Sequence, residues 1–384
     1  MSNDLLLTDE QKELQSMVRD FVRAEIIPHA AEWDRKSEFP MDVFKKAVDM
    51  GLTTLTFPES LGGAGMGARE AVIVAEELGY GDAGFAVSTG SCTLGVEPLL
   101  IGGTDKQKAM AAEFLNNGGL AAFGLTEPEA GSNAAALRTT AVKDGDEYVL
   151  NGSKCFITNG GIADLYTIFA TIDKEKGSKG ICCFLVERDR KGLSVGKEED
   201  KMGIRASNTA SVMLDEVRIP VDHLVGAEGM GYKLALGTLA RTRPSGNAAA
   251  VGIMQRALDL SVQYAMERKT FGKPILMNQG IQFMLADMEI LTQASRSMVW
   301  QAASMLDAGV VDSGFGACVK AFSGDAAMKV TTDAVQIYGG YGYSREYPVE
   351  KLMRDAKIYQ IFEGTNQIQR MIIAGGLAKA AQRR

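Results

Sequence analysis

The chain has 384 residues, more than one hydrophobic core usually serves, so two or three domains are expected. A charged fraction of 23% and a hydrophobic fraction of 46% are ordinary for a globular protein, and a net charge of −7 argues against nucleic acid as the main partner. The five cysteines are odd in number and show no CxxC spacing, which favours a reduced, cytoplasmic compartment.

The first third of the sequence carries helical patterns. Thr8 and Gln11 form a capping box ahead of an amphipathic stripe, and Thr104 and Gln107 repeat the box further along. A glycine-rich stretch at 57–67 lacks a flanking βαβ pattern, so a structural loop is favoured over a dinucleotide site. These signals predict a helical N-terminal domain over 1–119, with helices near 42–50 and 68–78 and another that ends near 115.

Membrane and metal sites are not expected. No apolar stretch approaches the ~20 residues that span a bilayer. The segment Met1–Thr8 lacks the basic region and long apolar run of a secretion signal. His29 and His223 are far apart in sequence, so a histidine-rich metal site is not predicted.

The pattern changes after Gly118-Gly119 to short apolar or β-branched runs separated by turns. Asp144-Gly145 is typical of a hairpin turn. Several short strands without intervening helices predict an antiparallel barrel or sandwich. The predicted β domain covers 120–228, with strands near 139–143, 148–150, 156–158, 165–172, 180–187, 193–196 and 211–219.

The helical period returns after Gly229-Met230-Gly231 and continues to the C-terminus. A helix of ~30 residues is ~45 Å long, the scale of an antiparallel bundle. The fold class predicted for the whole chain is therefore α+β multidomain, with a helical domain, an antiparallel β-barrel and a C-terminal four-helix bundle. The bundle covers 229–384, with helices near 232–239, 249–267, 279–308, 314–338 and 365–380.

Glu363 is the first candidate for chemistry. It lies between Phe362 and Gly364, just before a helix that Thr365 can cap. A carboxylate held in such a turn against aromatic walls is a candidate base with a raised pKa. The alternative is an acid that the helix dipole favours, and this stretch alone leaves both open.

Four other segments also suggest ligand binding. Small residues and free amides at 123–133 suit a wall against a planar or phosphorylated ligand, or simply a loop leading into the domain. Phe156 and Thr158 share one face of a strand, where they could stack on a ring and bond its edge, or belong to a plain strand and turn. Arg268 follows a long helix and suits either the helix dipole or a phosphate. Glycines at 339–342 allow close approach of a ligand.

Taken in order, these segments resemble the acyl-CoA dehydrogenase family over essentially the whole chain, as a short- or medium-chain-like member. The resemblance implies non-covalent FAD, an acyl-CoA substrate, an electron-transferring flavoprotein as partner, and a homotetramer built as a dimer of dimers. It is carried by Thr-Glu-Pro-x-Ala-Gly-Ser at 126–132, Ile-Thr-Asn-Gly-Gly at 157–161, Arg-Lys-Thr-Phe-Gly-Lys at 268–273 and Glu-Gly-Thr-Asn-Gln-Ile-Gln-Arg at 363–370.

The resemblance also implies roles for individual residues. Glu363 would remove the α-proton while the β-hydrogen leaves as hydride to flavin N5, giving the trans-2-enoyl-CoA. The Glu363 backbone N–H and a flavin ribityl hydroxyl would hold the thioester oxygen. The implied flavin contacts are Phe123, Leu125, Thr126, Ser132, Phe156 and Thr158 from one subunit, Arg268, Phe271, Gln336 and Gly340 from its neighbour, and Thr365 and Gln367 near the base. The implied substrate contacts are Ser132, Arg243, Phe362 and Gly364.

Departures from the family pattern bear on the substrate. Some branches place the base near 239–243, but 239–244 contains no acid, so Glu363 has no rival there. Phe156 stands where a Trp is common, and Ala240 replaces an Asp that many medium-chain members use. Because 245–247 is less aliphatic than in straight-chain enzymes, we predict an acyl pocket that is short or accepts a non-standard acyl group.

Two other functions remain open. An enoyl-CoA reductase would run the same chemistry in reverse, and the sequence does not fix the direction. A non-catalytic family member acting in assembly is disfavoured, because Glu363, Thr158 and Arg268 are all retained.

Overall fold

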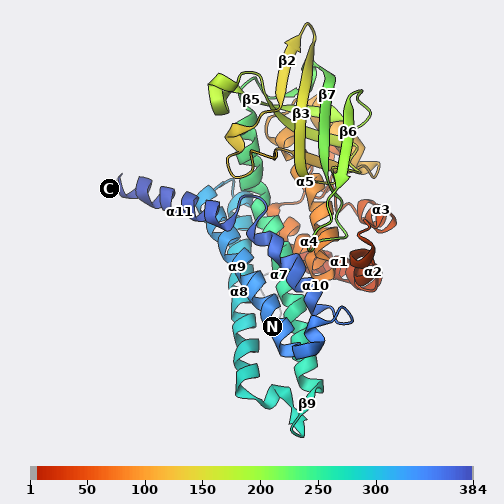
Figure 1. The fold of residues 1–384 in the computed structure, drawn as a ribbon, viewed down its shortest axis with the longest axis vertical. Helices are drawn as coiled ribbons and strands as arrows, with labels where there is room; N and C mark the ends of the chain where they lie inside the picture. The colour runs from red at the N-terminus through yellow and green to blue at the C-terminus, as the bar shows by residue number, and fades with distance from the viewer. Residues whose placement is uncertain (1–6, 383–384) are drawn as a thin grey trace.

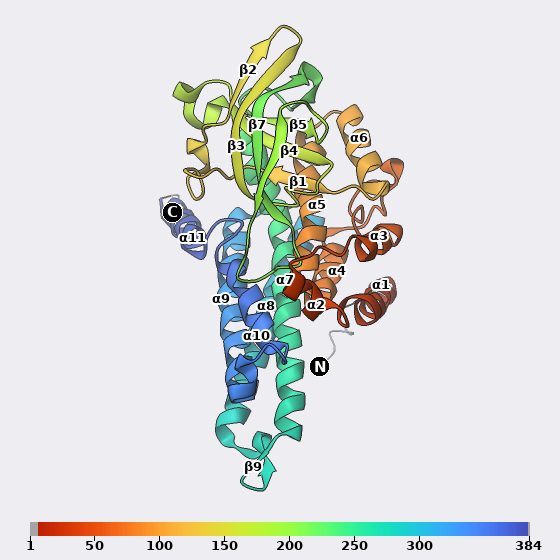
Figure 2. The ribbon, with the colours of Figure 1, turned by 45° about the vertical axis from the view of Figure 1, so that its right-hand side comes forward.

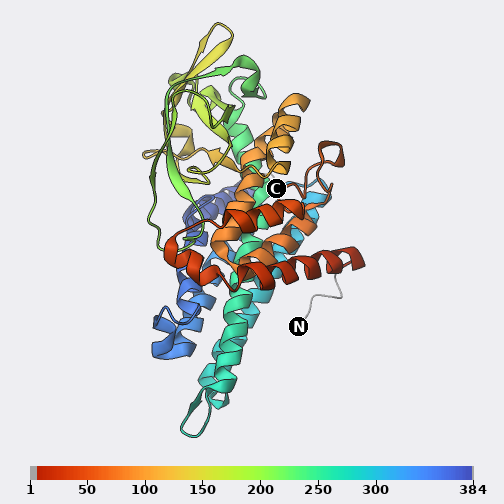
Figure 3. The same cartoon turned by 90° about the vertical axis from the view of Figure 1, so that its right-hand side faces the viewer.

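The computed structural model describes residues 7–382, so most of the segment Met1–Thr8 that was considered for a secretion signal lies outside the described residues. The molecule is elongated (Figure 1), with a β domain at one end of the long axis and a small hairpin at the other. Long helices connect the two ends, and the N-terminal helices pack against their side (Figure 3).

The N-terminal part is helical, as predicted. Both capping boxes are confirmed: the Thr8 hydroxyl accepts from the Gln11 N–H at 3.2 Å, and Thr104 and Gln107 make the same pair at 3.3 Å. The helices are α1 (Asp9–Phe21), α2 (Ala30–Lys36), α3 (Met41–Asp49), α4 (Ala68–Gly81), α5 (Ala83–Gly102) and α6 (Asp105–Asn116).

Helix α5 was not predicted as a separate element. Asp82 separates it from α4 and caps it by accepting from the Phe85 N–H at 2.8 Å. Within residues 7–382 it is the one helix long and apolar enough to cross a membrane, so the prediction that no stretch approaches this length is corrected. Because 61% of its most apolar window is buried inside the fold, its composition suits a core helix.

The β domain is one mixed sheet. Hydrogen bonds join its strands in the order β6-β7-β3-β2-β4-β5-β8, whose two ends are not paired with each other, and β1 pairs with β4 beside this path. Most pairs are antiparallel, as predicted, but β1 and β2 both run parallel to β4. The strands are β1 (Ala121–Gly124), β2 (Thr140–Asp144), β3 (Glu147–Thr158), β4 (Leu165–Thr171), β5 (Ile181–Glu187), β6 (Leu193–Glu198), β7 (Thr209–Pro220) and β8 (Leu224–Val225).

Strand β3 joins two runs that were predicted as separate strands, 148–150 and 156–158. Its register against β7 shifts between Leu150 and Gly152 and again between Lys154 and Ile157. Such irregularities bend a strand without ending it. The polar residues between the two runs therefore belong to the same strand.

The C-terminal part consists mainly of long helices (Figure 2). The predicted break between 239 and 249 is wrong, because α7 runs unbroken through Pro244. Close packing outweighs the local cost of proline here: a Cβ on Gly252 would lie 2.0 Å from Glu76 O on α4. The elements are α7 (Gly231–Glu267), the hairpin β9 (Lys269–Thr270) and β10 (Lys273–Pro274), α8 (Gln279–Asp307), α9 (Ser313–Tyr338), α10 (Val349–Ala356), the 3-10 turn η9 (Lys357–Gln360) and α11 (Asn366–Ala381).

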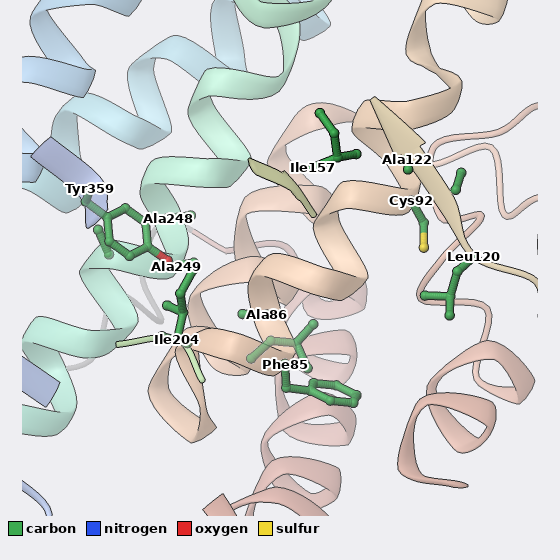
Figure 4. Close-up of a cluster of buried hydrophobic side chains, with 14 of the residues drawn as sticks. Phe85, Ala86, Cys92, Leu120, Ala122, Ile157, Ile204, Ala248, Ala249 and Tyr359 are labelled. Atoms are coloured by element: carbon green, nitrogen blue, oxygen red, sulfur yellow. The ribbon is translucent and has the colours of Figure 1, made fainter. Parts of the chain in front are cut away.

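All three parts contribute to one buried core. Figure 4 shows Phe85 from α5, Ile157 from β3, Ile204 from the loop before β7, Ala248 from α7 and Tyr359 from η9 in the same region. The predicted boundaries at 119/120 and 228/229 fall between α6 and β1 and between β8 and α7. Whether the three parts are separate folding units stays a prediction.

A buried ionic cluster fixes α10, the helix that leads to Glu363. Lys351 Nζ lies 2.6 Å from both Asp82 Oδ2 on α5 and Asp355 Oδ2 on α10. The Ile204 N–H donates to Asp355 Oδ1 at 2.6 Å. Buried charges of this kind are tolerated only when paired, so the cluster ties α10 to both neighbouring domains.

Candidate active site

Glu363 lies in a short turn between η9 and α11 and has a left-handed backbone, with φ +54°. A non-glycine residue rarely adopts this conformation unless the surrounding structure holds it there. Gln369 Nε2 donates to the carbonyl oxygens of Glu363 at 3.2 Å and of Gly364 at 3.0 Å. Thr365 caps α11 as predicted, accepting from the Ile368 N–H at 3.2 Å. The turn is therefore held from both sides.

The carboxyl group of Glu363 faces α7. A Cβ built on Gly246 would lie 3.2 Å from its Oε2 and 3.5 Å from its Oε1. On the other side, the Phe362 ring packs edge-on against Tyr359, with 4.9 Å between ring centroids. Glu363 as a whole residue keeps partial exposure.

The electrostatics of this turn suit a base that works near neutral pH. Burial raises the pKa of Glu363 to about 7, against the opposing effect of the positive charges of Arg243 and Lys320. A carboxyl group with this pKa can both accept and release a proton near pH 7. Phe362 and Tyr359 form an aromatic pair next to this turn, and their role as walls of the Glu363 carboxyl group stays a prediction.

Arg243 is a buried cation whose side chain lies close enough to Glu363 to feel its charge. Only 5% of its surface is exposed, and within residues 7–382 its Nε makes no hydrogen bond. Burial lowers the pKa of its guanidinium group, while the charge of Glu363 raises it. A buried donor left unpaired in this way indicates a site for an acceptor from a ligand or an ordered water.

A second set of predicted residues lies where β1 meets β3. The Cys155 N–H donates to the Thr126 carbonyl at 3.0 Å, and the Phe123 ring packs 4.9 Å from that of Phe169. Beneath them Lys154 Nζ and Glu127 Oε1 form a fully buried ion pair at 2.6 Å. The ion pair and the hydrogen bond fix the path of the chain through Leu125 and Thr126.

Phe156 is a large apolar side chain that is exposed on this wall. It is 66% exposed and has φ +56°, at the second irregularity of β3. Its neighbours Cys155 and Ile157 are buried, whereas Thr158 is partly exposed. An exposed ring suits the face of a planar ligand. The irregular backbone at Phe156 interrupts the regular alternation of β3, so a shared face with Thr158 stays a prediction. Ser132 is exposed on the loop that follows β1.

A third set lies at the far end of α7. A cavity of about 440 Å³ there is lined by Arg268, Tyr338, Gly340 and Tyr341, among others. The Arg268 guanidinium lies 5.4 Å over the Tyr341 ring. Phe271, on the hairpin, is fully exposed, and Gln336 and Gly340 are exposed at the end of α9.

The comparisons with known proteins cover the same three parts. Models of the acyl-CoA dehydrogenase N-terminal, middle and C-terminal domains match residues 8–117, 122–217 and 229–378. The chain belongs to the acyl-CoA dehydrogenase family. Acyl-CoA dehydrogenases are FAD-dependent oxidoreductases, and this fold of helical, β and helical parts is theirs.

Relatives match over nearly their full lengths. The probable acyl-CoA dehydrogenase FadE25 of Mycobacterium tuberculosis is 44% identical over 379 residues, 97% of this chain and 96% of its own. An acyl-CoA dehydrogenase of Bacillus subtilis is 44% identical over 370 residues, 96% of this chain and 98% of its own. The structure of butyryl-CoA dehydrogenase from Megasphaera elsdenii superposes with a TM-score of 0.95 at 41% identity, covering 97% of this chain and 99% of the other.

A second structural match comes from a study of the electron transferring flavoprotein of Acidaminococcus fermentans and flavin-based electron bifurcation. The matched chain has a TM-score of 0.95 and 41% identity, with coverage of 97% of this chain and 98% of the other. A glutaryl-coenzyme A dehydrogenase in complex with glutaryl-CoA matches with a TM-score of 0.93 at 36% identity, covering 96% and 95%.

In this acyl-CoA dehydrogenase the predicted residues form two separated groups. The β-domain wall lies at the inner edge of the β domain, where β1 and the end of β3 meet α5 (Figure 4). Arg268 and Gly340 instead line the cavity beside the hairpin that carries Phe271, and Gln336 lies at the end of α9 (Figure 1). Phe362, Gly364 and Thr365 share the turn of Glu363 between these groups, and Gln367 is exposed on the first turn of α11.

Sequence reasoning missed several residues around the base. Gly246 and Lys320 approach Glu363 from α7 and α9, and Gln369 and Asn366 hold its turn from α11. The one available signal was Lys320 itself, a lysine within a largely apolar helical run. Asn366 and Gln369 stood within the quoted motif at 363–370 and Gly246 within 245–247, but their contacts with the Glu363 turn became visible only in the packed structure.

Proposed function

We propose that this protein catalyses FAD-dependent α,β-dehydrogenation of an acyl-CoA thioester to the trans-2-enoyl-CoA, with Glu363 as the base. The observation that carries this proposal is the Glu363 turn, because a rare backbone conformation holds one carboxyl group against Gly246 of α7. Burial, offset by two cations, brings the pKa of this carboxyl group to about 7. Sequence reasoning required a shift of this size for a base that works near pH 7.

The proposed role of Glu363 is to take the α-proton of the substrate onto its carboxylate. Within residues 7–382 its own backbone N–H donates no hydrogen bond to another backbone group. That N–H is therefore free to bind the thioester oxygen and stabilise the negative charge that develops there. The unpaired Nε of Arg243 supports a role for this side chain in holding substrate or water beside the base.

The residues of the β-domain wall suit FAD. The exposed Phe156 ring would stack on the isoalloxazine, Thr158 would bond its edge, and Phe123, Leu125, Thr126 and Ser132 would border it. Bound FAD would supply the acceptor for the β-hydrogen as hydride. The aromatic, arginine-lined cavity near the hairpin suits the adenosine diphosphate part of a second FAD, held by the neighbouring subunit.

A homotetramer built as a dimer of dimers is consistent with this division of the flavin contacts. Exposed apolar side chains support it: Phe271 on the hairpin, Phe283 and Ile290 on the same face of α8, and Met371 and Leu377 on α11. Such surfaces are typical of subunit contacts. We further propose an electron-transferring flavoprotein as the oxidant that regenerates the enzyme, in a cytoplasmic setting that suits five free cysteines.

The acyl group is proposed to be short or non-standard. Gly246 lies beside the Glu363 carboxyl group, and its neighbour Ser245 is partly exposed. Bulkier aliphatic residues at these two positions would give the acyl pocket a different shape. Butyryl-CoA and glutaryl-CoA are the acyl groups named for two structural matches. A chain-length series that shows best turnover with long saturated acyl-CoAs would contradict this part of the proposal.

The test is an anaerobic titration of the purified yellow protein with a panel of acyl-CoAs, following the flavin absorption band. We expect at least one short acyl-CoA to bleach the band in the wild type. Glu363→Gln should retain FAD and bind the thioester without bleaching. Normal bleaching by this variant would refute the base assignment, and a colourless protein that does not take up FAD would refute the function.

A further inference from the structure

Lys320 is a buried cation that the proposed reaction does not yet use. It lies on α9 with 1% of its surface exposed, and its Nζ donates a hydrogen bond of 2.8 Å to Asn366 Oδ1. Within residues 7–382 this is the only hydrogen bond of the ammonium group. Since a buried ammonium group is costly without a counter-ion, a carboxylate nearby should balance its charge.

Asn366 holds this ammonium group in a defined place. Its Nδ2 donates to the Ala321 carbonyl at 3.0 Å and to Asp325 Oδ1 at 2.8 Å. Both amide hydrogens are thereby used, so Oδ1 is left to accept from Lys320. Asn366 follows Glu363 by three positions in the same motif, and Lys320 is therefore tied to the helix that begins just after the base.

Two carboxylates act electrostatically on Lys320, and one of them is already engaged. Asp325 accepts from Arg370 at 2.6 Å and from Gln360 at 2.7 Å, besides Asn366. Glu363 has no such partner within residues 7–382. Burial lowers the pKa of Lys320 to about 8, and the charge of Glu363 opposes this more strongly than that of Asp325.

We propose that Lys320 is a positioning residue for the base: held by Asn366 in the buried cluster beside the Glu363 turn, its ammonium group supplies a positive charge that keeps the Glu363 carboxylate ionised. This inference rests on the proposed role of Glu363. The other charged or titratable groups that face the base are Arg243 from α7 and the buried Tyr359 hydroxyl from η9, with Asp325 behind Lys320 on α9.

The sign of the effect follows from the surroundings of Glu363. Burial raises the pKa of this carboxyl group, whereas Arg243 and Lys320 lower it. Removal of the Lys320 charge leaves burial opposed by Arg243 alone, so the carboxyl group binds its proton more tightly. The base is then ionised only at higher pH, and activity at low pH falls while activity at high pH recovers.

The test is the pH profile of kcat/KM for Lys320→Met in the full-length, FAD-loaded protein. The acid limb should move up by about 1–2 pH units, since a nearby opposite charge shifts a carboxyl group by this much. At a pH below both limbs this is a loss of about 10–100-fold. Lys320→Gln, which keeps a donor for Asn366, should shift the limb similarly and serves if the methionine variant does not fold.

A matched control is Lys329→Met on the same helix, where the lysine is exposed and pairs with Asp333. It should leave the acid limb unmoved. A second measurement follows the infrared band of the protonated Glu363 carboxyl group as a function of pH. The band is isolated by subtracting the spectrum of a protein with Glu363→Gln from that of the wild type, and likewise for the Lys320→Met protein. Its midpoint should be near pH 7 with Lys320 and higher without it.

The outcomes separate this inference from the proposed function. An unmoved limb, or a loss that is the same at every pH, would overturn the role of Lys320 while an inactive Glu363→Gln keeps the base assignment intact. Normal bleaching by Glu363→Gln would instead overturn the base itself, whatever Lys320 does.

Discussion

The change Gly246→Ala isolates the placement of the base from the stability of the fold. Its Cβ would lie 3.2 Å from Glu363 Oε2, 3.5 Å from Oε1 and 3.6 Å from Cδ. Only the carboxyl group stands that close, so the helix can accept the methyl group if the carboxyl group moves by a few tenths of an ångström. The methyl group also removes water from the carboxylate, which favours its protonated form.

The change should move activity and stability in opposite directions. A misplacement of 1 Å costs about 100-fold in rate, so a shift of about 0.3 Å should lower kcat/KM about fourfold. Alanine is a better helix former than glycine by about 1 kcal/mol, so the free energy of unfolding should stay level or rise. Activity should therefore fall in a protein that is no less stable.

The assay combines thermal unfolding with kcat/KM across pH for the variant and for a control. Gly237→Ala lies on the same helix, and its Cβ would meet only Ile101 Cδ1, at 3.6 Å. It should gain the same helix propensity and keep full activity. If Gly246→Ala keeps wild-type kcat/KM and acid limb, the carboxyl group does not act from the position described here.

Three further predictions concern other links of the account. In the wild type, kcat/KM should fall as pH drops through about 7, because the pKa of Glu363 is raised to that value and its ionised form is required; a profile flat down to pH 5 would count against it. Gly252→Ala should lower the free energy of unfolding by about 3 kcal/mol in denaturant titrations, because its Cβ would meet backbone atoms of α4 at 2.0 and 2.5 Å; unchanged stability would mean that α4 and α7 pack less closely. Phe271→Ala should change stability by less than about 0.5 kcal/mol, since the side chain is fully exposed. The same variant should lose FAD faster on dialysis, and wild-type retention would exclude Phe271 as a contact to the neighbouring subunit's flavin.

Elements with local cues could be predicted from the sequence. The boxes at Thr8 and Thr104 mark the starts of α1 and α6, because a cap is made within four residues. Helix α5 lacks a stripe because it is buried on most sides, so no period marked it. The predicted break between 239 and 249 is absent, since α7 continues through Pro244 while it packs closely against α4.

The candidate site divides in the same way. The motif around Glu363 indicated the base and its cap, since Phe362, Gly364 and Thr365 are neighbours in sequence. The partners that tune it, Gly246 and Lys320, come from helices far away in the chain and required the packed structure. The separation of Phe156 from Phe271 likewise became visible only in three dimensions.

The central claim is that the Glu363 carboxylate removes the α-proton of a bound acyl-CoA. The most direct measurement is incorporation of solvent deuterium at the α-carbon of a bound acyl-CoA in D₂O, followed by mass spectrometry. The wild type should exchange this proton, fastest above pH 7, and Glu363→Gln should exchange it at the rate of the thioester in buffer. Exchange by Glu363→Gln at the wild-type rate would contradict the account.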